Sequence, residues 1–325
     1  MTKQAPVFFS VVIPVYGSEP ILRKLYQRLI AVMEGMEKPF EIIFVEDSGP
    51  DGAWPVLRDL AKSDKRVRAI QLMSNSGQGA ATYCGFSHAS GQFVITMDDD
   101  LQHPPEEIPA MWDAIRSQES VDVIMGVPRK KQHNFIRRLG SRFIHRVNCI
   151  FLSKDPNLQF TSFRIIRRPL VQGMLELKTL YPALGPMINS VTHRIGNIIV
   201  EHAPRQEGRS GYSMGKIMKQ TMGNFIGYSM LPLRLLAIFG AVGIVTSLLL
   251  ATILLVRYFL GDTTVPGWTS LALLLVILSG FNFFAFAVLG EYVIRILQRS
   301  NHTPQYIIRE VVGARRLSKE ANDAA

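Results

Sequence analysis

The stretch Val94-Ile-Thr-Met-Asp-Asp-Asp-Leu-Gln102 joins a run of apolar and β-branched residues to three consecutive carboxylates. A buried strand that ends in acidic residues is typical of open α/β sheets, which bind ligands at the carboxyl ends of their strands. Asp98 and Asp100 are two residues apart, so in an extended segment both carboxylates lie on one side. Such a pair suits a hard divalent cation. Taken alone, the pattern is more often a solvated acidic turn.

Alternating strand and helix patterns surround this stretch. Apolar runs predict strands at residues 8–15, 40–45, 67–72, 93–97 and 121–126, and helical spacing predicts helices at 21–33, 54–61, 80–89 and 105–118. Strands that alternate with helices indicate an α/β fold with a mostly parallel sheet and right-handed crossovers. Acidic or Gly/Asn-rich loops follow three successive strands, so we expect a ligand site at that edge of the sheet.

Composition points toward a membrane. The 325 residues include 36 Lys and Arg against 26 Asp and Glu, with a net charge of +10 and a positive mean hydropathy of +0.15. The basic residues cluster near apolar spans and form no aromatic-interleaved patch, which argues against nucleic acid as a partner. Two cysteines are too few for a disulfide framework and indicate a reducing compartment. Prolines interrupt the first apolar run, so we expect no signal peptide.

The second half of the chain is basic and then strongly apolar. We expect amphipathic helices at residues 135–151 and 213–230, with a short strand or turn at 161–168 between them. Residues 235–256 and 268–290 are uncharged and long enough to cross about 30 Å of hydrocarbon. A buried hairpin of soluble helices is the alternative. The expected domains are a large α/β domain at 1–212, a juxtamembrane helix at 213–234, a transmembrane hairpin at 235–294 and a tail at 295–325.

The distribution of positive charge predicts the topology of this hairpin. Lys216, Lys219 and Arg234 precede the first span, several arginines follow the second, and the connecting loop has few charges. The positive-inside rule then places the α/β domain and both termini in the cytoplasm. We therefore expect a multi-pass protein of a bacterial cytoplasmic (inner) membrane.

Four short motifs follow one another in the first part of the chain. They are Val12-Ile-Pro-Val-Tyr16 with Glu19, Glu46-Asp47 with Asp51, Asn75-x-Gly77, and Asp98-Asp-Asp-Leu-Gln-His-Pro-Pro-Glu106. In this order they resemble the GT-A (Rossmann-like) domain of family 2 glycosyltransferases. Leu231-Pro-Leu-Arg234, Leu289-Gly-Glu-Tyr292 and Pro304-Gln-Tyr-Ile307 are similar to the polyprenyl-phosphate glycosyltransferases of that family, which include bactoprenol glucosyltransferases and undecaprenyl-phosphate 4-deoxy-4-formamido-L-arabinose transferases. The resemblance covers nearly the whole chain.

The resemblance implies a donor site at the carboxyl edge of the sheet. Asp98 and Asp100 would hold Mg²⁺ or Mn²⁺ on the diphosphate of a nucleotide sugar, where the metal acts as a Lewis acid. Asp47 matches the carboxylate that reads the uracil and ribose. The full set of donor-binding candidates is Pro14, Tyr16, Glu19, Asp47, Gln78, Asp98, Asp99 and Gln102. From the residues alone, strand-end packing for Pro14 and Tyr16 and an exposed helix-start acid for Glu19 stay equally open, and His103 is a loop residue.

The acceptor side departs from the family pattern. The family often has an Asp near Gln159, treated as a candidate base, and a Lys where Gly211 stands. A lipid phosphate has a second pKa of about 6 and is largely dianionic at neutral pH, so it needs no base. Cations must instead bring two phosphate groups together. The candidates are Arg164 and Arg205 in a catalytic role and Arg129, Lys131, Arg137, Arg138 and Arg209 at the acceptor phosphate. A basic face against anionic lipid is the alternative.

These observations lead to one expectation and several alternatives. We expect a metal-dependent, inverting enzyme that moves a single sugar, of glucose or amino-arabinose type, from a UDP-linked donor to undecaprenyl phosphate for modification of cell-envelope glycans such as lipopolysaccharide. A GDP-mannose:polyprenyl-phosphate mannosyltransferase is the nearest alternative. A processive polysaccharide synthase would carry a Gln-x-x-Arg-Trp motif, and here no tryptophan follows an arginine. A non-catalytic membrane scaffold has no need of carboxylates at successive strand ends.

The expected partners follow from this reaction. They are a nucleotide sugar, a polyprenyl phosphate lipid, the membrane, and a downstream flippase and glycosyltransferase. The strand-like run at residues 303–312 also suggests a homo-oligomer that associates through the C-terminal tail.

Overall fold

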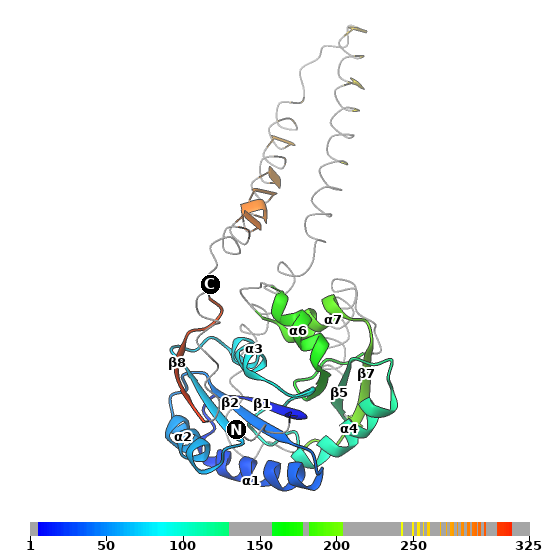
Figure 1. Cartoon of the computed structure of the whole chain (residues 1–325). Helices are drawn as coiled ribbons and strands as arrows, with labels where there is room; N and C mark the ends of the chain where they lie inside the picture. The colour runs from blue at the N-terminus through cyan, green and yellow to red at the C-terminus, as the bar shows by residue number, and fades with distance from the viewer. Residues whose placement is uncertain are drawn as a thin grey trace. The chain divides into compact units, whose positions relative to one another are not determined.

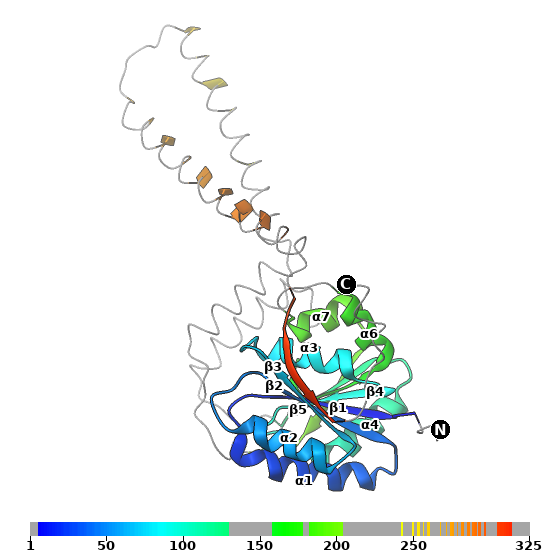
Figure 2. The ribbon, with the colours of Figure 1, turned by 60° about the vertical axis from the view of Figure 1, so that its left-hand side comes forward.

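The structure is a computed structural model, drawn in Figures 1 and 2. It describes residues 6–129, 158–177, 182–203 and 304–313, together with single positions between residues 242 and 296. The chain divides into two compact units, Met1–Ser213 with Thr303–Ala325, and Met214–His302. All the described candidate site residues belong to the first unit.

The first part of the chain alternates strands and helices. Its elements are β1 (Phe9–Val15), α1 (Glu19–Gly35), β2 (Phe40–Glu46), α2 (Ala53–Ser63), β3 (Val67–Leu72), α3 (Gln78–His88), β4 (Phe93–Thr96), η1 (Pro105–Glu107), α4 (Ile108–Ser117) and β5 (Val123–Pro128). They are followed by β6 (Arg164–Arg167), α6 (Arg168–Glu176), α7 (Leu184–Val191), β7 (Ile195–Val200) and β8 (Ile308–Val312). The strands and helices predicted between residues 8 and 126 are confirmed, with small shifts at their ends.

The strands of the described residues join one eight-stranded sheet in the order β7-β5-β6-β4-β1-β2-β3-β8. Strand β1 is parallel to both β2 and β4, and β2 is parallel to β3. Strand β6 runs antiparallel between β4 and β5, and β8 runs antiparallel along β3. The prediction of a mostly parallel sheet is confirmed for β1, β2, β3, β4, β5 and β7, which run in one direction, and β6 and β8 run opposite to them and make the sheet mixed. Strand β6 has four residues and β8 has five, too few for the alternating pattern to reveal their direction.

Helices cover both faces of this sheet (Figure 1). On one face, α1, α2 and α4 pack against the sheet around Ile13, Phe44 and Ile95, all buried. On the other face α3 lies on β1 and β2, and α6 follows beside it. Side chains alternate between the faces, so Val12 meets α3 at Gly85 while Ile13 enters the opposite core. Each fully buried Leu, Ile or Phe stabilises the fold by about 1.5–3 kcal/mol.

The elements between residues 164 and 200 were largely missed. The pattern predicted only a short strand or turn at 161–168, and the structure has β6, α6, α7 and β7 in this part of the chain. Strand β6 has four residues and α7 has eight, too few for a clear period. Strand β7 is only half-buried along most of its length, because it is an edge strand beside β5.

The C-terminal segment belongs to the first compact unit. Strand β8 pairs with β3 of the same chain from Leu72 to Ala69 and forms the edge of the sheet (Figure 2). Gly313 closes it with φ +97°, and a Cβ there would lie 2.2 Å from Val67 O. The run predicted for self-association is thus used within the chain. The tail expected as a separate region contributes a strand to the sheet of this unit.

The predicted membrane spans, 235–256 and 268–290, and the helix at 213–230 lie mostly or wholly outside the described residues. Among the positions that are described, no helix is long and apolar enough to cross a bilayer. Single described positions in the second unit are helical and apolar, and Ile253 and Phe286 are 56% and 68% exposed. The helix expected at 135–151 also lies outside the described residues.

Candidate active site

The candidate site lies at the carboxyl edge of β4, β1, β2 and β3. Because these four strands are parallel neighbours, the loops that follow them meet at one edge of the sheet. Strand β1 lies between β4 and β2. The chain therefore adds β2 and β3 on one side of β1 and later adds β4 on its other side. This reversal is where open α/β sheets form their ligand crevice.

Asp98 follows β4 and is held by two different elements. Its Oδ1 accepts a hydrogen bond from Gln78 Nε2 at 2.6 Å, at the first turn of α3. Its Oδ2 accepts one from Ser162 Oγ at 2.6 Å, just before β6. The side chain is 27% exposed, so solvent and ligands can still reach it. Gln78, a predicted donor contact, therefore positions a predicted metal ligand.

Asp100 and Gln102 form a local turn beside it. The Gln102 N–H donates to Asp100 Oδ1 at 3.1 Å. Within the described ranges, no group of three or more His, Cys, Asp or Glu side chains is arranged to hold a metal ion. Asp98 and Asp100 nevertheless fit a hard divalent cation, because both are half-buried carboxylates at one strand end and such an ion fills its other positions with substrate phosphate and water.

Asp99, the middle carboxylate, serves the chain itself. Its Oδ2 accepts the Tyr16 N–H at 3.0 Å and the Ser18 hydroxyl at 2.5 Å. Burial raises the pKa of Asp99 to about 6, against the effect of these hydrogen bonds. Asp99 thus ties the loop after β4 to the loop after β1. Tyr16 is 52% exposed, so its ring is available at the edge of the sheet.

Asp47, at the end of β2, is buried and fully engaged. Its two carboxylate oxygens accept the N–H groups of Ser76 and Gly77 at 2.7 and 2.8 Å. Burial raises its pKa, and the two backbone hydrogen bonds oppose that rise. Gly77 has φ +89°, which favours glycine at this turn. In the structure Asp47 positions the loop before α3, so any contact with a nucleotide would come in addition to this.

Glu19 and Pro14 also have structural partners. Glu19 Oε2 accepts the Gly52 N–H at 3.0 Å, and Asp51 Oδ2 accepts the Glu19 N–H at 2.8 Å. Glu19 therefore joins two loops of the site edge. Pro14 is buried in β1 opposite Val45, which favours packing for this residue.

Arg164 is the buried cation of the site. It begins β6, opposite Thr96, and its guanidinium Nε and Nη1 have no hydrogen-bond partner among the described residues. Burial lowers its pKa to about 10, and the charge of Asp98 opposes this change. The register puts the Arg164 and Thr96 side chains on the α3 face, and Asp98 follows Thr96 by two residues. A buried guanidinium with unpaired N–H groups indicates an anionic ligand.

The sequence pattern did not identify two histidines that lie at this edge, His103 and His202, as site residues. His103 is buried, with its ring stacked on Phe163 at 5.2 Å and 26°. The ring of His202, which follows β7, lies 5.2 Å from that of His103 at 65°. His103 Nε2 lies 4.0 Å from Asp98 Oδ2. The run at 195–200, which ends just before His202, was the available signal, since it is apolar and β-branched.

Of the other basic candidates, the structure describes Arg129. Arg129 is exposed at the end of β5, where its N–H donates to Val200 O at 3.4 Å. Lys131, Arg137, Arg138, Arg205 and Arg209 lie outside the described residues. Gln159 is exposed, and its backbone is bound on both sides by the Asn197 side chain at 2.8 and 2.9 Å.

Comparison with known proteins extends these observations. Residues 10–174 match the model of the family described as "Glycosyl transferase family 2". The chain is 35% identical over 319 residues to the undecaprenyl-phosphate 4-deoxy-4-formamido-L-arabinose transferase of Edwardsiella ictaluri, covering 96% of this chain and 97% of that protein. It is 33% identical over 317 residues to the protein of the same name from Proteus mirabilis, covering 97% of each.

A solved structure shares the fold. Glucosyl-3-phosphoglycerate synthase from Mycobacterium tuberculosis, crystallised with Mn²⁺, UDP and glucosyl-3-phosphoglycerate, superposes with a TM-score of 0.51 at 15% identity, over 69% of this chain and 80% of that one. The motif order, the mixed sheet and the acidic strand ends agree with the family match. The chain is a glycosyltransferase and belongs to glycosyl transferase family 2.

Proposed function

We propose that this enzyme transfers one sugar from a nucleotide sugar, UDP-linked and of glucose or amino-arabinose type, to undecaprenyl phosphate. The carrying observation is the opposition of charges at one sheet edge, with Asp98 and Asp100 after β4 and the unpaired guanidinium of Arg164 on neighbouring β6. The curated relatives named above support the lipid acceptor. The chain shares its fold with an enzyme that was crystallised with Mn²⁺ and UDP, which supports a UDP-linked donor.

The carboxylates would hold the donor and the arginine the acceptor. Asp98 and Asp100 are the residues that would bind Mg²⁺ or Mn²⁺, which supplies Lewis-acid chemistry at a diphosphate. Arg164 donates through its Nε and Nη1, which have no partner among the described residues, to a phosphate oxygen in a site shielded from water. Tyr16 presents its exposed ring at the same edge, where a base can stack. The acceptor oxygen attacks from the side opposite the diphosphate, so the anomeric configuration inverts.

Proximity is the main contribution of the fold in this proposal. An ionised phosphate needs no proton removed before it attacks, which agrees with an exposed Gln159 whose backbone is bound by Asn197. The enzyme must hold two phosphate groups close together, and oriented cations do this. The exposed apolar helical positions of the second unit, such as Phe259 at 80%, support attachment to the membrane that contains the lipid.

A donor panel tests the proposal. Purified full-length protein in detergent is given undecaprenyl phosphate, Mn²⁺ and radiolabelled UDP-glucose, UDP-4-amino-4-deoxy-L-arabinose, its formamido derivative or GDP-mannose. A lipid-linked monosaccharide of inverted configuration from one UDP donor is expected. Product only from GDP-mannose would support the mannosyltransferase alternative, a polymer would support a synthase, and no product with any donor would support a scaffold.

Variants of the two charges separate their roles. Asp98→Asn with Asp100→Asn should abolish transfer. Arg164→Met should raise the KM for undecaprenyl phosphate about 10- to 100-fold, the loss expected for a hydrogen bond to a charged group, while the donor KM changes little. Asp59→Asn and Arg23→Met, an exposed pair on α2 and α1, are the matched controls. Unchanged transfer by the double Asn variant would overturn the mechanism.

A further inference from the structure

Ser162 connects β6 to the acidic loop. Its hydroxyl donates to Asp98 Oδ2 at 2.6 Å, and its carbonyl accepts the Thr96 hydroxyl at 2.6 Å. Thr96 is the last residue of β4, so the strand that leads to Asp98 also fixes the backbone of Ser162. The serine hydroxyl is therefore held at one distance and one direction from the carboxylate.

His103 approaches the same hydroxyl from the other side. His103 Nε2 lies 3.5 Å from Ser162 Oγ, a long contact. A serine hydroxyl has one proton, and the ionised Asp98 carboxylate can only accept, so that proton lies on the line to Asp98. The tautomer of His103 that carries its proton on Nε2 directs that proton at Ser162 Oγ. The arrangement is a directed chain, from His103 through Ser162 to Asp98.

Two ring contacts and a neighbouring backbone hydrogen bond restrain His103. It is 6% exposed, stacks on Phe163, the residue after Ser162, and meets His202 edge to face. The carbonyl of the preceding residue, Gln102, accepts the Ala203 N–H at 3.0 Å. The segment after β7 thus closes over the acidic loop. The ring has little freedom to turn away from Ser162.

We propose that Ser162, supported by His103, is a positioning residue that orients Asp98 for the metal ion. This inference rests on the proposed function. Gln78 on Oδ1 and Ser162 on Oδ2 approach Asp98 from α3 and from β6, so together they fix the plane of the carboxylate. Each oxygen keeps another lone pair for a cation. Hydrogen bonds of this kind to a ligand typically change metal affinity 10- to 100-fold.

Metal binding measured without turnover tests the role of Ser162. Mn²⁺ affinity is measured by electron paramagnetic resonance on full-length protein in detergent, with and without UDP. Ser162→Ala should weaken Mn²⁺ binding about 10- to 100-fold. Ser162→Thr, which keeps the hydroxyl, should restore most of the affinity. At saturating Mn²⁺ the kcat of Ser162→Ala should return to within a few fold of the wild type.

His103 variants test the chain. His103→Phe keeps a ring to stack on Phe163 but has no donor, and should weaken Mn²⁺ binding less than Ser162→Ala. The double variant should bind Mn²⁺ as Ser162→Ala does, because His103 acts through the serine. Ser190→Ala, which removes a hydroxyl bound to Met187 O at 2.8 Å on α7, is the control for loss of a serine.

The outcomes separate this inference from the proposed function. Wild-type Mn²⁺ affinity in Ser162→Ala overturns the positioning role even if sugar transfer proceeds as proposed. A wild-type chain with no measurable Mn²⁺ affinity overturns it as well. Absence of transfer to undecaprenyl phosphate by the wild type overturns the proposed function, and the Mn²⁺ comparison still decides the role of Ser162.

Discussion

Asp51 accepts the N–H of Glu19 at 2.8 Å, and Glu19 in turn accepts the N–H of Gly52, the residue after Asp51, at 3.0 Å. Glu19 begins α1 and Gly52 precedes α2. The Asp51 carboxylate therefore binds the N–H at the start of α1, and the Glu19 carboxylate binds the N–H just before α2. The exchange joins the loops after β1 and β2, which border the proposed donor site. Its consequences can be tested separately from catalysis.

We expect Glu19→Gln to be tolerated and Glu19→Ala to destabilise the protein by about 0.5–2 kcal/mol, the usual effect of losing a side-chain acceptor at a helix start. Asp51→Ala should cost a similar amount, and the double variant less than the sum, because the two contacts share one loop pair. Urea unfolding of the purified protein measures these values. Asp59→Asn, on the exposed face of α2, is the control. Full additivity would contradict the coupling.

The C-terminal strand should protect Cys84. This thiol is fully buried and hydrogen-bonds with Tyr306 of the tail, and burial raises its pKa to about 12. In a Cys149→Ser background Cys84 is the remaining cysteine. We expect iodoacetamide to label it very slowly at pH 8, and Tyr306→Ala to accelerate labelling at least about tenfold, since removal of the ring opens access to the thiol. Mass spectrometry of the labelled peptide gives the rate.

Ile307→Ala is the control for this experiment, because Ile307 is next in sequence but 55% exposed. It should leave the labelling rate unchanged. Equal rates for Tyr306→Ala and the wild type would show that the tail does not cover Cys84.

Glu41 and Arg68 form a buried ion pair on β2 and β3. They are 9% and 6% exposed, with Arg68 Nη2 3.7 Å from Glu41 Oε2. Arg68→Met should destabilise the protein by about 3–5 kcal/mol, because a buried carboxylate loses its counter-charge. Adding Glu41→Gln should recover much of this loss, since a neutral amide still accepts from Ser10 and Ser90. Denaturant unfolding measures both, and a double variant as unstable as Arg68→Met would contradict the charge explanation.

His88 should make stability depend on pH. Burial lowers the pKa of His88 below its ordinary value of 6.5, and its Nδ1 lies 2.9 Å from Cys84 O. The unfolded chain therefore binds the proton more readily than the folded one. Stability rises with pH through the interval between the lowered pKa and about 6.5, and is lost as pH falls through it. Melting temperatures from pH 5 to 8 should show this loss.

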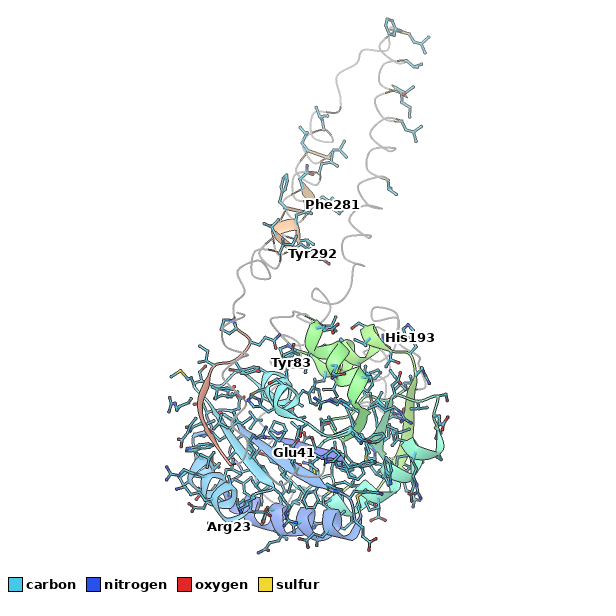
Figure 3. The ribbon with its side chains drawn as sticks, viewed as in Figure 1. Arg23, Glu41, Tyr83, His193, Phe281 and Tyr292 are labelled. Atoms are coloured by element: carbon cyan, nitrogen blue, oxygen red, sulfur yellow. The ribbon has the colours of Figure 1, made fainter. Side chains whose placement is uncertain are left out.

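His88→Gln should reduce the fall in melting temperature at acid pH, because glutamine does not titrate. His193→Gln, at an exposed position near α7, should leave it unchanged (Figure 3). Parallel curves for His88→Gln and the wild type would show that other groups cause the loss.

Much of the site edge could be predicted from local patterns. Asp98, Asp47 and Glu19 all lie at the carboxyl edge, as the strand-end positions indicated. Their contacts could not be predicted. Asp47 binds the loop at Ser76 and Gly77, 29 and 30 residues away, because β2 and β3 are neighbours in the sheet. A strand order decides such contacts, and periodicity carries no information about strand order.

By itself, the sequence determined the alternating α/β core. A strand or helix that buries part of its surface needs apolar residues at regular positions, and this spacing can be recognised from neighbouring residues alone. It also determined that carboxylates end successive strands. Only the tertiary structure decided that β6 and β8 enter the sheet antiparallel, and that Ser162 meets Asp98 across 64 residues of chain. The physical reason is that strand order depends on the packing of the whole sheet. A strand of four residues such as β6 takes its place and direction from the strands on either side of it.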